Sequence, residues 1–184
     1  FHNETKFDEL MDSIQKEKVR LIIIGDGREK SDLENLVKSN KLNSIIFIDQ
    51  QPLNKIPELV LHADILLLSL KVGKVGSYTI PGKFSTYLKF GLPILCHAKG
   101  EVSEIVKNNN FGLCSNPGDI NTLKKNILSL KDLKDKNKID IFKNSKNFDL
   151  FNFDKSFIRL DKKLLSIKKK ITEIRLITSP QQIP

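Results

Sequence analysis

The sequence predicts an α/β fold in which a parallel β-sheet carries helices on both faces. Two observations support this prediction. Five short apolar runs, rich in Ile, Leu and Val, recur between residues 19 and 115. Each run is followed by a segment whose apolar residues recur at helical spacing. Strands that alternate with helices in this way are typical of the doubly wound, Rossmann-like class. A chain of 184 residues has room for one such domain and an appendage.

The five strands are predicted from their composition. The first run, VRLIIIGDG at residues 19–27, is apolar almost to its end and fits a strand that is covered on both faces. The other runs have the same Ile- and Leu-rich character, and they lie at residues 44–49, 63–70, 92–97 and 111–115. We therefore expect five parallel strands in this part of the chain.

The helices between the strands are predicted from spacing and from residues that suit helix ends. After the first strand, Leu33, Leu36 and Val37 recur at helical spacing between charged residues. Gly91 suits the end of one helix, and Asp119 suits the start of another. The helices are predicted at residues 28–40, 55–63, 82–90, 100–110 and 117–130.

The domain organisation follows from these elements. We expect residues 1–150 to form a Rossmann-like domain. We expect residues 151–184 to form a C-terminal helical extension, because the chain after Leu133 has amphipathic, helical spacing. One stretch of that extension, TEIRLITS at residues 172–179, is β-favourable. A strand there that joins the sheet is the alternative, which we rank below a helix.

The net charge of +9 favours an anionic partner but does not indicate nucleic acid. The cations are 27 Lys and 4 Arg, without the arginine and aromatic interleaving that base recognition tends to use. Much of the lysine lies after Asp119 on predicted helices, where a solvated face is the simplest reading and weak contact with an anionic membrane is the alternative. Cys96 and Cys114 lack metal-ligand spacing, which predicts free, buried thiols and no metal site.

Three loops follow predicted strands at the edge of the sheet where ligands of this fold class collect. The first contains Gly25 and Gly27, which allow a ligand's phosphate or sugar to approach the backbone amides closely. A tight turn explains the same two glycines, and the rest of the dinucleotide-binding fingerprint is absent. The second loop is residues 49–52. The third, residues 71–83, leads into a predicted helix.

The third loop carries the most specific chemistry. A helix start has unpaired amides and a partial positive charge, so it attracts anions. Lys83, on the first turn, adds a full charge for a phosphate, and Thr86, one turn later, faces the same way and can reach a sugar hydroxyl. A surface lysine beside a simple connector is the alternative. No catalytic triad or close carboxylate pair stands out, although His97 and Glu101 follow a predicted strand and border the same edge.

The order and spacing of these pieces resemble a known family. The pieces are RLIIIGDGREKSDLENL, IIFIDQQPLNKIPELVLHADILLLSL, IPGKFSTYLKFGLPIL, GEVSEIV and FGLCSNPGDINTLKKNI. Over residues 6–130 they resemble the C-terminal, donor-binding half of group 1 (family 4) glycosyltransferases of the two-domain GT-B type. The Pro-x-Lys loop ending at Lys83, followed by the Gly-x-Pro at residues 91–93, looks closest to the bacterial branch that assembles surface polysaccharides.

The resemblance implies a donor site at the carboxyl edge of the sheet. It places Lys83 and the amides of residues 77–83 near the pyrophosphate and Thr86 near the ribose. The family's frequent pair of glutamates separated by seven residues is absent, and Tyr78 and Thr86 stand at the matching positions. Gln51 and Pro52 match positions near the base, and Gly25 and Gly27 match positions that face the donor. The residues that the resemblance assigns to donor binding are Gly25, Gly27, Gln51, Pro52, Ser77, Tyr78, Lys83 and Thr86.

The function that the resemblance implies is sugar transfer from a nucleoside-diphosphate donor, which we expect to be UDP-linked. The transfer would retain the anomeric configuration, need no metal or other cofactor, and deliver the sugar to a glycan or lipid-linked acceptor in surface-polysaccharide biosynthesis. No catalytic residue is identified in the chain itself. By this resemblance residues 1–150 are a nucleotide-sugar-binding domain that is partial at its N-terminus. The family's first, central strand and its acceptor domain have no match in the sequence, so we expect the chain alone to be inactive.

Two other functions remain open at this stage. A non-catalytic Rossmann-like domain that binds a nucleotide or a protein is the main alternative, because the glutamate pair is absent. A sugar-nucleotide epimerase of the same architecture would need acid and base groups in the cleft, and none is located. The longest apolar run, residues 65–70, is far too short to cross a bilayer, so we expect a cytoplasmic location, with the inner face of the membrane as the place of any lipid contact.

Overall fold

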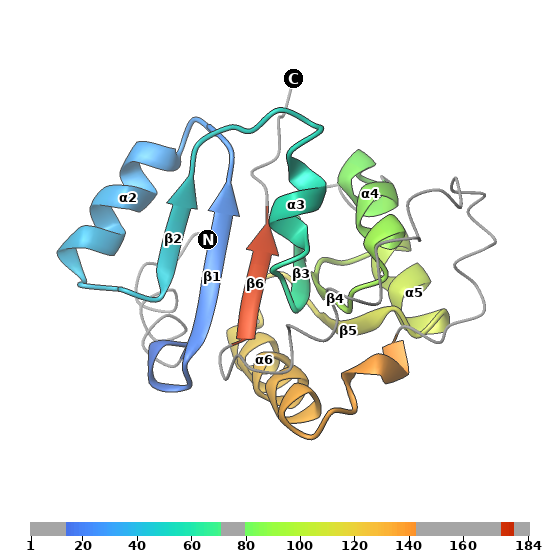
Figure 1. Ribbon diagram of the computed structural model, residues 1–184. Coiled ribbons are helices and arrows are strands. Elements are labelled where there is room, and N and C mark those ends of the chain that lie inside the picture. Colours follow the sequence, from blue (N-terminus) through green and yellow to red (C-terminus); the bar gives the residue numbers. More distant parts are fainter. Residues whose placement is uncertain (1–13, 71–79, 143–173, 179–184) are drawn as a thin grey trace.

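The computed structural model describes residues 14–70, 80–142 and 174–178. Within these residues it shows a six-stranded sheet whose strands are all parallel (Figure 1). Each of the five predicted strands is present. In chain order the strands are β1 (Val19–Ile24), β2 (Ile45–Ile48), β3 (Ile65–Ser69), β4 (Ile94–His97), β5 (Gly112–Ser115) and β6 (Ile174–Thr178).

The helices also follow the predicted spacing. Gly91 adopts the left-handed conformation (φ 60°, ψ 22°) that ends a helix, and the Asp119 carboxylate accepts a hydrogen bond of 3.0 Å from the Thr122 amide, which confirms both predicted helix ends. The helices are α2 (Lys30–Ser39), α3 (Ile56–Val60), α4 (Gly82–Phe90), α5 (Glu101–Asn108) and α6 (Ile120–Asp135), with a short 3₁₀ helix at Ile139–Phe142.

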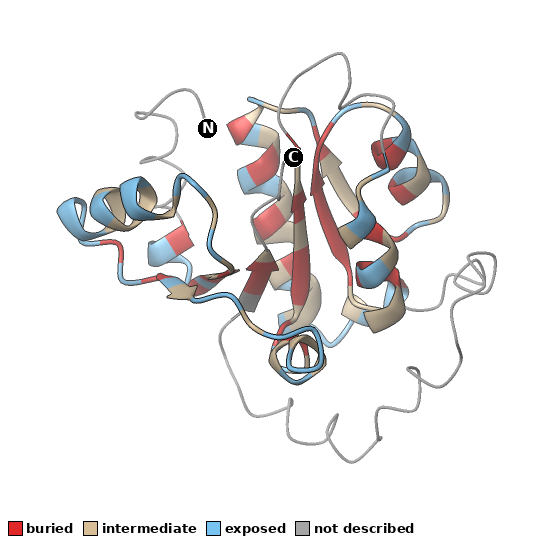
Figure 2. Ribbon diagram, turned by 90° about the horizontal axis from the view of Figure 1, so that it is seen from above, coloured by how far each residue is buried: buried red, intermediate tan, exposed pale blue. Residues whose placement is uncertain are grey.

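The helices divide between the two faces of the sheet. Helices α2 and α6 pack on one face through residues such as Val37 and Leu123, and helices α3, α4 and α5 pack on the other through residues such as Val60 and Phe84. Figure 2 shows the buried strands enclosed between these two layers. Because both faces are covered, the strands are apolar almost throughout, as the sequence indicated.

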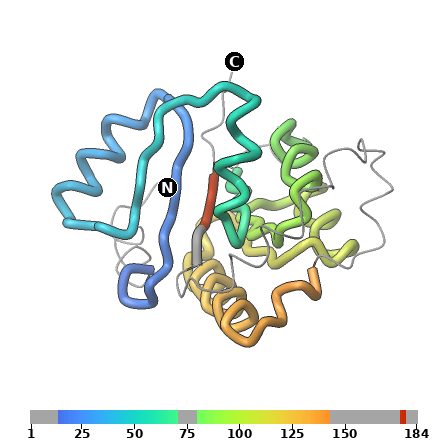
Figure 3. Tube along the Cα trace, in the orientation of Figure 1, coloured from blue at the N-terminus to red at the C-terminus, as the bar shows by residue number. Residues whose placement is uncertain are grey.

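The strand order is β2-β1-β6-β3-β4-β5, so the last strand in the sequence lies in the middle of the sheet. Figure 3 shows this C-terminal strand between the N-terminal segment that contains β1 and the segment that contains β3. Residues 174–178 pair with 19–23 of β1, and Leu176 and Ile177 pair with the start of β3. The two side chains are 1% and 4% exposed and pack in the cores on opposite faces.

This strand corrects the expectation of a helical extension at residues 174–178. Amphipathic spacing favoured a helix, but a gap between two parallel strands offers main-chain partners on both sides, and the β-favourable sequence fills that gap. The strand alternative for residues 172–179 therefore holds at Ile174–Thr178. The rest of the predicted extension lies outside the described residues. No helix in the described part of the chain is long and apolar enough to cross a membrane.

Candidate functional site

A cleft of about 850 Å³ opens at the carboxyl edge of the sheet. This is the edge at which the strand arrows of β1, β2 and β6 point upward in Figure 1. The cleft is bordered by the turn after β1, the loop after β2, helix α3, the end of β6 and the cleft-facing side of α4. Its polar lining residues are Asp26, Arg28, Gln50, Gln51, Lys83, Thr86 and Tyr87.

Helix α4 is held so that one side faces the sheet and the other faces the cleft. Phe84, Tyr87 and Leu88, at helical spacing, are buried against the sheet. The Tyr87 hydroxyl also donates a hydrogen bond of 3.3 Å to the backbone carbonyl of Leu67 in β3. These contacts place Lys83, one residue before Phe84, at the cleft wall.

The start of α4 has the features of an anion site. Pro81 precedes the first helical residue in an extended conformation, and no side chain among the described residues makes a capping hydrogen bond to the helix start. Lys83 lies in this first turn and is only partly exposed. Burial lowers the pKa of Lys83 to about 8, from an ordinary value of 10.5. Since a desolvated ammonium group gains more from an anion than a hydrated one does, this lysine is suited to bind a phosphate.

The opposite wall is the turn after β1. Gly25 has a φ of 133°, in the region that favours glycine, and its amide donates a hydrogen bond of 2.9 Å to the carbonyl of Ile48 at the end of β2. The Asp26 carboxylate accepts a hydrogen bond of 2.9 Å from the Gln50 amide. The turn after β1 and the loop after β2 are thus joined, and both line the cleft.

The structure brings together five of the eight residues that the sequence assigned to donor binding. Gly25, Gly27, Gln51, Lys83 and Thr86 all line the cleft. Pro52 is exposed and is not among the lining residues, and its carbonyl accepts a hydrogen bond of 2.9 Å from the Lys55 amide. Ser77 and Tyr78 lie outside the described residues. The binding role of all eight remains a prediction.

Sequence reasoning missed several lining residues. Tyr87 and Phe90 follow Lys83 by four and seven residues, so helical spacing from Lys83 was the signal that could have found them. Gln50 precedes the predicted Gln51, and Arg28 follows the GDG turn directly. For Arg28 and Gln50 the only available signal was their position in loops after strands.

His97 and Glu101 are not among the lining residues, contrary to the expectation that they border the cleft. His97 is 4% exposed, and burial lowers the pKa of its imidazole. The Gly118 amide donates to Nε2 over 3.2 Å, so Nε2 carries no proton and Nδ1 donates to the Ser115 hydroxyl over 2.7 Å. This neutral histidine links the end of β4 to the loop after β5, which is a structural role.

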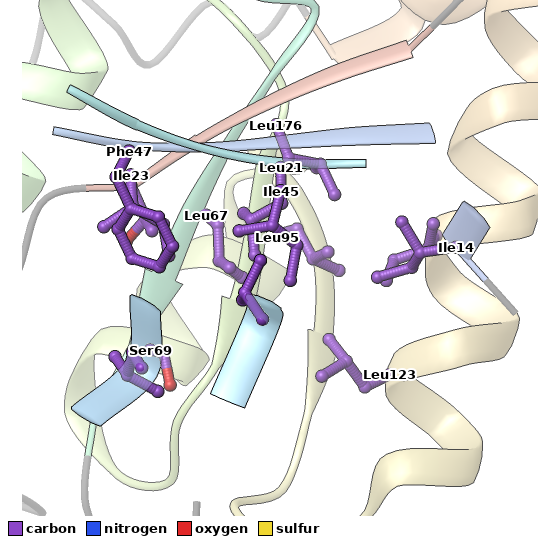
Figure 4. Close-up of a pocket in the computed structure, with 14 residues that line it drawn as sticks. Ile14, Leu21, Ile23, Ile45, Phe47, Leu67, Ser69, Leu95, Leu123 and Leu176 are labelled. Atoms are coloured by element: carbon purple, nitrogen blue, oxygen red, sulfur yellow. The ribbon is translucent and has the colours of Figure 1, made fainter. Parts of the chain in front are cut away.

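A second cavity lies inside the apolar core and has a different character. It measures about 100 Å³ and lies between the sheet and the layer of helices α2 and α6. Figure 4 shows hydrocarbon side chains such as Leu21, Leu95 and Leu176 around it, with Ser69 as the labelled residue with a side-chain hydroxyl. This cavity is too small for a nucleotide and offers almost no polar partner, so we assign the candidate site to the cleft.

Within the described residues, no group of three or more His, Cys, Asp or Glu side chains is arranged to hold a metal ion. Cys96 is buried and Cys114 partly buried, and both are free thiols. Among the residues that line the cleft, Arg28 and Lys83 are the basic side chains, and the start of α4 adds a partial positive charge.

A family model described as "Glycosyl transferases group 1" matches residues 5–147 of the chain. The chain belongs to the group 1 glycosyltransferase family. The family predicted from the order of the motifs is thereby confirmed. No curated protein sequence is similar enough to count as a match.

Solved structures support the fold assignment. The chain resembles Anabaena HepE in its crystal structure with UDP-glucose, with a TM-score of 0.62 and 17% sequence identity. The HepE structures with UDP and glucose and with UDP alone give TM-scores of 0.60 and 0.56, at the same identity. In each case the alignment covers 88% of this chain and 44% of HepE. The chain thus has the Rossmann-like α/β fold of one half of a GT-B glycosyltransferase and spans less than half the length of HepE.

Proposed function

We propose that this chain is the C-terminal, donor-binding half of a retaining, metal-independent glycosyltransferase that uses a UDP-linked sugar. The observation that carries the proposal is Lys83 at the start of α4, facing a glycine turn across a cleft of about 850 Å³. A cleft of this size accommodates a nucleotide sugar. That HepE was crystallised with UDP-glucose, with UDP and glucose, and with UDP supports the choice of donor.

The proposed arrangement follows from the chemistry of the two walls. The diphosphate lies at the start of α4, where the Lys83 ammonium group and backbone amides carry positive charge. Thr86, one turn further along the same wall, reaches the ribose. The base lies at the loop after β2, where Gln50 and Gln51 line the cleft and Gln51 offers amide donors and acceptors.

The proposed role of this half in the reaction is electrostatic. When the bond between the sugar and the diphosphate breaks, negative charge develops on the departing diphosphate. Lys83 and the amides at the start of α4 would stabilise that charge. The acceptor would bind a second half that this chain does not supply. In this proposal the acceptor is a glycan or lipid-linked sugar of bacterial surface-polysaccharide assembly, at the cytoplasmic face of the membrane. The proposal therefore predicts donor binding, but no transfer, by the chain alone.

A second candidate, a domain that binds a nucleotide without catalysis, is favoured by one observation. Thr86, which replaces one of the two glutamates frequent in the family, lines the cleft. A threonine hydroxyl can bind a ribose but carries no negative charge. The two candidates predict the same donor binding and differ in turnover, so both measurements are needed.

The binding test is a calorimetric titration of the 184-residue chain with UDP and UDP-glucose. We expect saturable binding of both, and we expect Lys83→Met to weaken binding by at least tenfold. Lys89→Met, a change on the same helix outside the cleft lining, is the matched control and should bind as the wild type does. Absence of binding, or equal weakening by the two variants, would contradict the proposal.

The turnover test uses a protein that contains this chain together with an acceptor-binding half. We expect transfer that persists in EDTA and, by NMR of the product, retains the anomeric configuration of the donor. UDP binding without any transfer would favour the non-catalytic candidate. Transfer with inversion, or transfer abolished by EDTA, would refute the corresponding part of the proposal.

A further inference from the structure

An ion-pair cluster ties together two of the loops that border the cleft. The Lys30 ammonium group lies 2.6 Å from a carboxylate oxygen of Asp26 and 2.5 Å from one of Asp49. Asp26 belongs to the turn after β1, Asp49 directly follows β2, and Lys30 is the first residue of α2. The Lys30 side chain therefore links the turn after β1, the loop after β2 and the start of α2. The first two of these lie at the same edge of the sheet.

The cluster continues into the backbone of the loop after β2. The second carboxylate oxygen of Asp26 accepts a hydrogen bond of 2.9 Å from the Gln50 amide. The side-chain amide of Gln51 donates a hydrogen bond of 3.1 Å to the carbonyl of Asp49. Each of the two glutamines is thus tied to a residue that pairs with Lys30.

The exposures of the three charged groups show which of them a ligand can reach. The Lys30 side chain is 17% exposed, whereas those of Asp26 and Asp49 are 49% and 85% exposed. Asp26, Gln50 and Gln51 line the cleft, and Lys30 is not among the lining residues. Any effect of Lys30 on the cleft would therefore pass through its partners.

The charges of the cluster are mutually stabilised. The hydrogen bonds that the Lys30 ammonium group donates to Asp26 and Asp49 raise the pKa of Lys30 above its ordinary value, and the bond donated to Asp26 lowers the pKa of that carboxyl group. These two shifts favour the charged forms of Lys30 and Asp26. The Asp26 carboxylate, which faces a cleft proposed to bind a diphosphate, is thus partly neutralised by Lys30 from behind.

We propose that Lys30 is a positioning residue for base selection: by pairing with Asp26 and Asp49, it holds the loop of Gln50 and Gln51 in the conformation that discriminates among nucleotide bases. This inference rests on the proposed function, because it assumes that the cleft takes a nucleoside diphosphate. It assigns base selection to an ion pair outside the cleft lining and leaves diphosphate binding to Lys83.

The test compares UDP with ADP, because the two ligands share the diphosphate and ribose and differ in the base. The measured quantity is the ratio of their dissociation constants, Kd(ADP)/Kd(UDP), for the 184-residue chain. Any change in repulsion between Asp26 and the diphosphate affects both ligands alike and cancels in the ratio. We expect the wild-type chain to prefer UDP and Lys30→Met to lower the ratio at least fivefold.

Three variants separate positioning from general damage. Lys30→Arg keeps a cation that can bridge both carboxylates and should restore most of the ratio. Lys83→Met should weaken UDP and ADP binding alike and leave the ratio unchanged. Lys55→Met, which removes an exposed lysine paired with Glu58 at 3.6 Å near the same loop, is the matched control and should also leave the ratio unchanged.

A further variant guards against misfolding of Lys30→Met, which a thermal melt would reveal. Asp49→Ala removes one partner of Lys30 at a side chain that is 85% exposed, so it should fold normally and lower the ratio in part. The inference is overturned if Lys30→Met and Asp49→Ala keep the wild-type ratio, or if the wild-type chain binds UDP and ADP equally. Absence of binding of both nucleotides would instead overturn the proposed function, and the inference with it.

Discussion

The lowered pKa of Lys83 predicts that nucleotide binding weakens as the solution becomes mildly alkaline. Burial lowers this pKa to about 8, so about nine-tenths of the lysine is charged at pH 7 and about one-tenth at pH 9. If the charged form binds the diphosphate, the association constant for UDP should fall about tenfold between these two pH values. An exposed lysine with an ordinary pKa would remain charged over the whole interval.

The assay is a set of UDP titrations from pH 7 to pH 9 with the wild-type chain and with Lys83→Arg. Arginine stays protonated throughout, so the ratio of wild-type to variant affinity at each pH isolates Lys83 and cancels any titration of UDP itself. We expect this ratio to fall about tenfold across the range. A ratio that does not change with pH would refute the reasoning, because it would show that Lys83 does not titrate here or does not bind the diphosphate.

The same lowered pKa predicts that the stability of the fold increases as the pH rises, whereas nucleotide binding weakens. Because the unfolded chain binds a proton at residue 83 more tightly than the folded chain does, the charged form of Lys83 opposes folding below pH 8, and stability increases as the pH rises from about 8 toward 10.5. Lys83→Met should therefore stabilise the chain at pH 7, by at most about 3 kcal/mol, while it weakens UDP binding. Urea denaturation at pH 7 measures the stability, and a Met variant less stable than the wild type would contradict the burial argument.

Three further predictions concern positions where the structure is specific. Apart from its chain neighbours and its own helix, a Cβ at Gly82 would meet no atom of the described residues within 4 Å, and Gly82 lines the cleft. Gly82→Ala should therefore keep the free energy of unfolding or raise it by up to about 1 kcal/mol, yet weaken UDP binding severalfold in calorimetry. Leu176 is 1% exposed in the middle of the sheet, so Leu176→Ala should lower the free energy of unfolding, measured by urea denaturation, by about 2–5 kcal/mol. A decrease below about 0.5 kcal/mol would show that β6 is not in the sheet. A Cβ at Gly112 would lie 1.9 Å from the carbonyl oxygen of Ile94, so Gly112→Ala should unfold the chain or lower its melting temperature strongly by circular dichroism, and a wild-type melt would contradict the close pairing of β4 and β5.

The five strands β1 to β5 and the ends of two helices could be predicted from sequence because they depend on local pattern. An apolar run bounded by turn residues reads as a strand wherever the strand is placed, and Gly91 and Asp119 act on the helix ends beside them. The wrong expectation at residues 174–178 has a physical cause. Whether a short segment with both helical and β character forms a helix or a strand depends on its partners. Here β1 and β3 offer main-chain groups on both sides, so the segment forms a strand.

The candidate site likewise contains residues whose place could be predicted from the sequence and contacts that could not. Lys83, Thr86 and the glycines could be placed at one edge of the sheet because the carboxyl ends of parallel strands lie together. The pairing of Lys30 with Asp49, 19 residues away, could not be predicted, since both are ordinary charged residues that would suit a solvated surface. The burial of His97 could not be predicted either, because it depends on the loop that contains Gly118, whose amide donates a hydrogen bond to the His97 ring.

By itself, the sequence of this protein determined the parallel α/β class, the family and the loops that border the cleft, since periodicity and motif spacing are local properties of the chain. Only the tertiary structure decided that β6 closes the middle of the sheet, that Lys83 is desolvated, and that Lys30 joins two loops. Each of these depends on contacts between segments far apart in the sequence, and strand partners, desolvation and ion pairs exist only once those segments have come together.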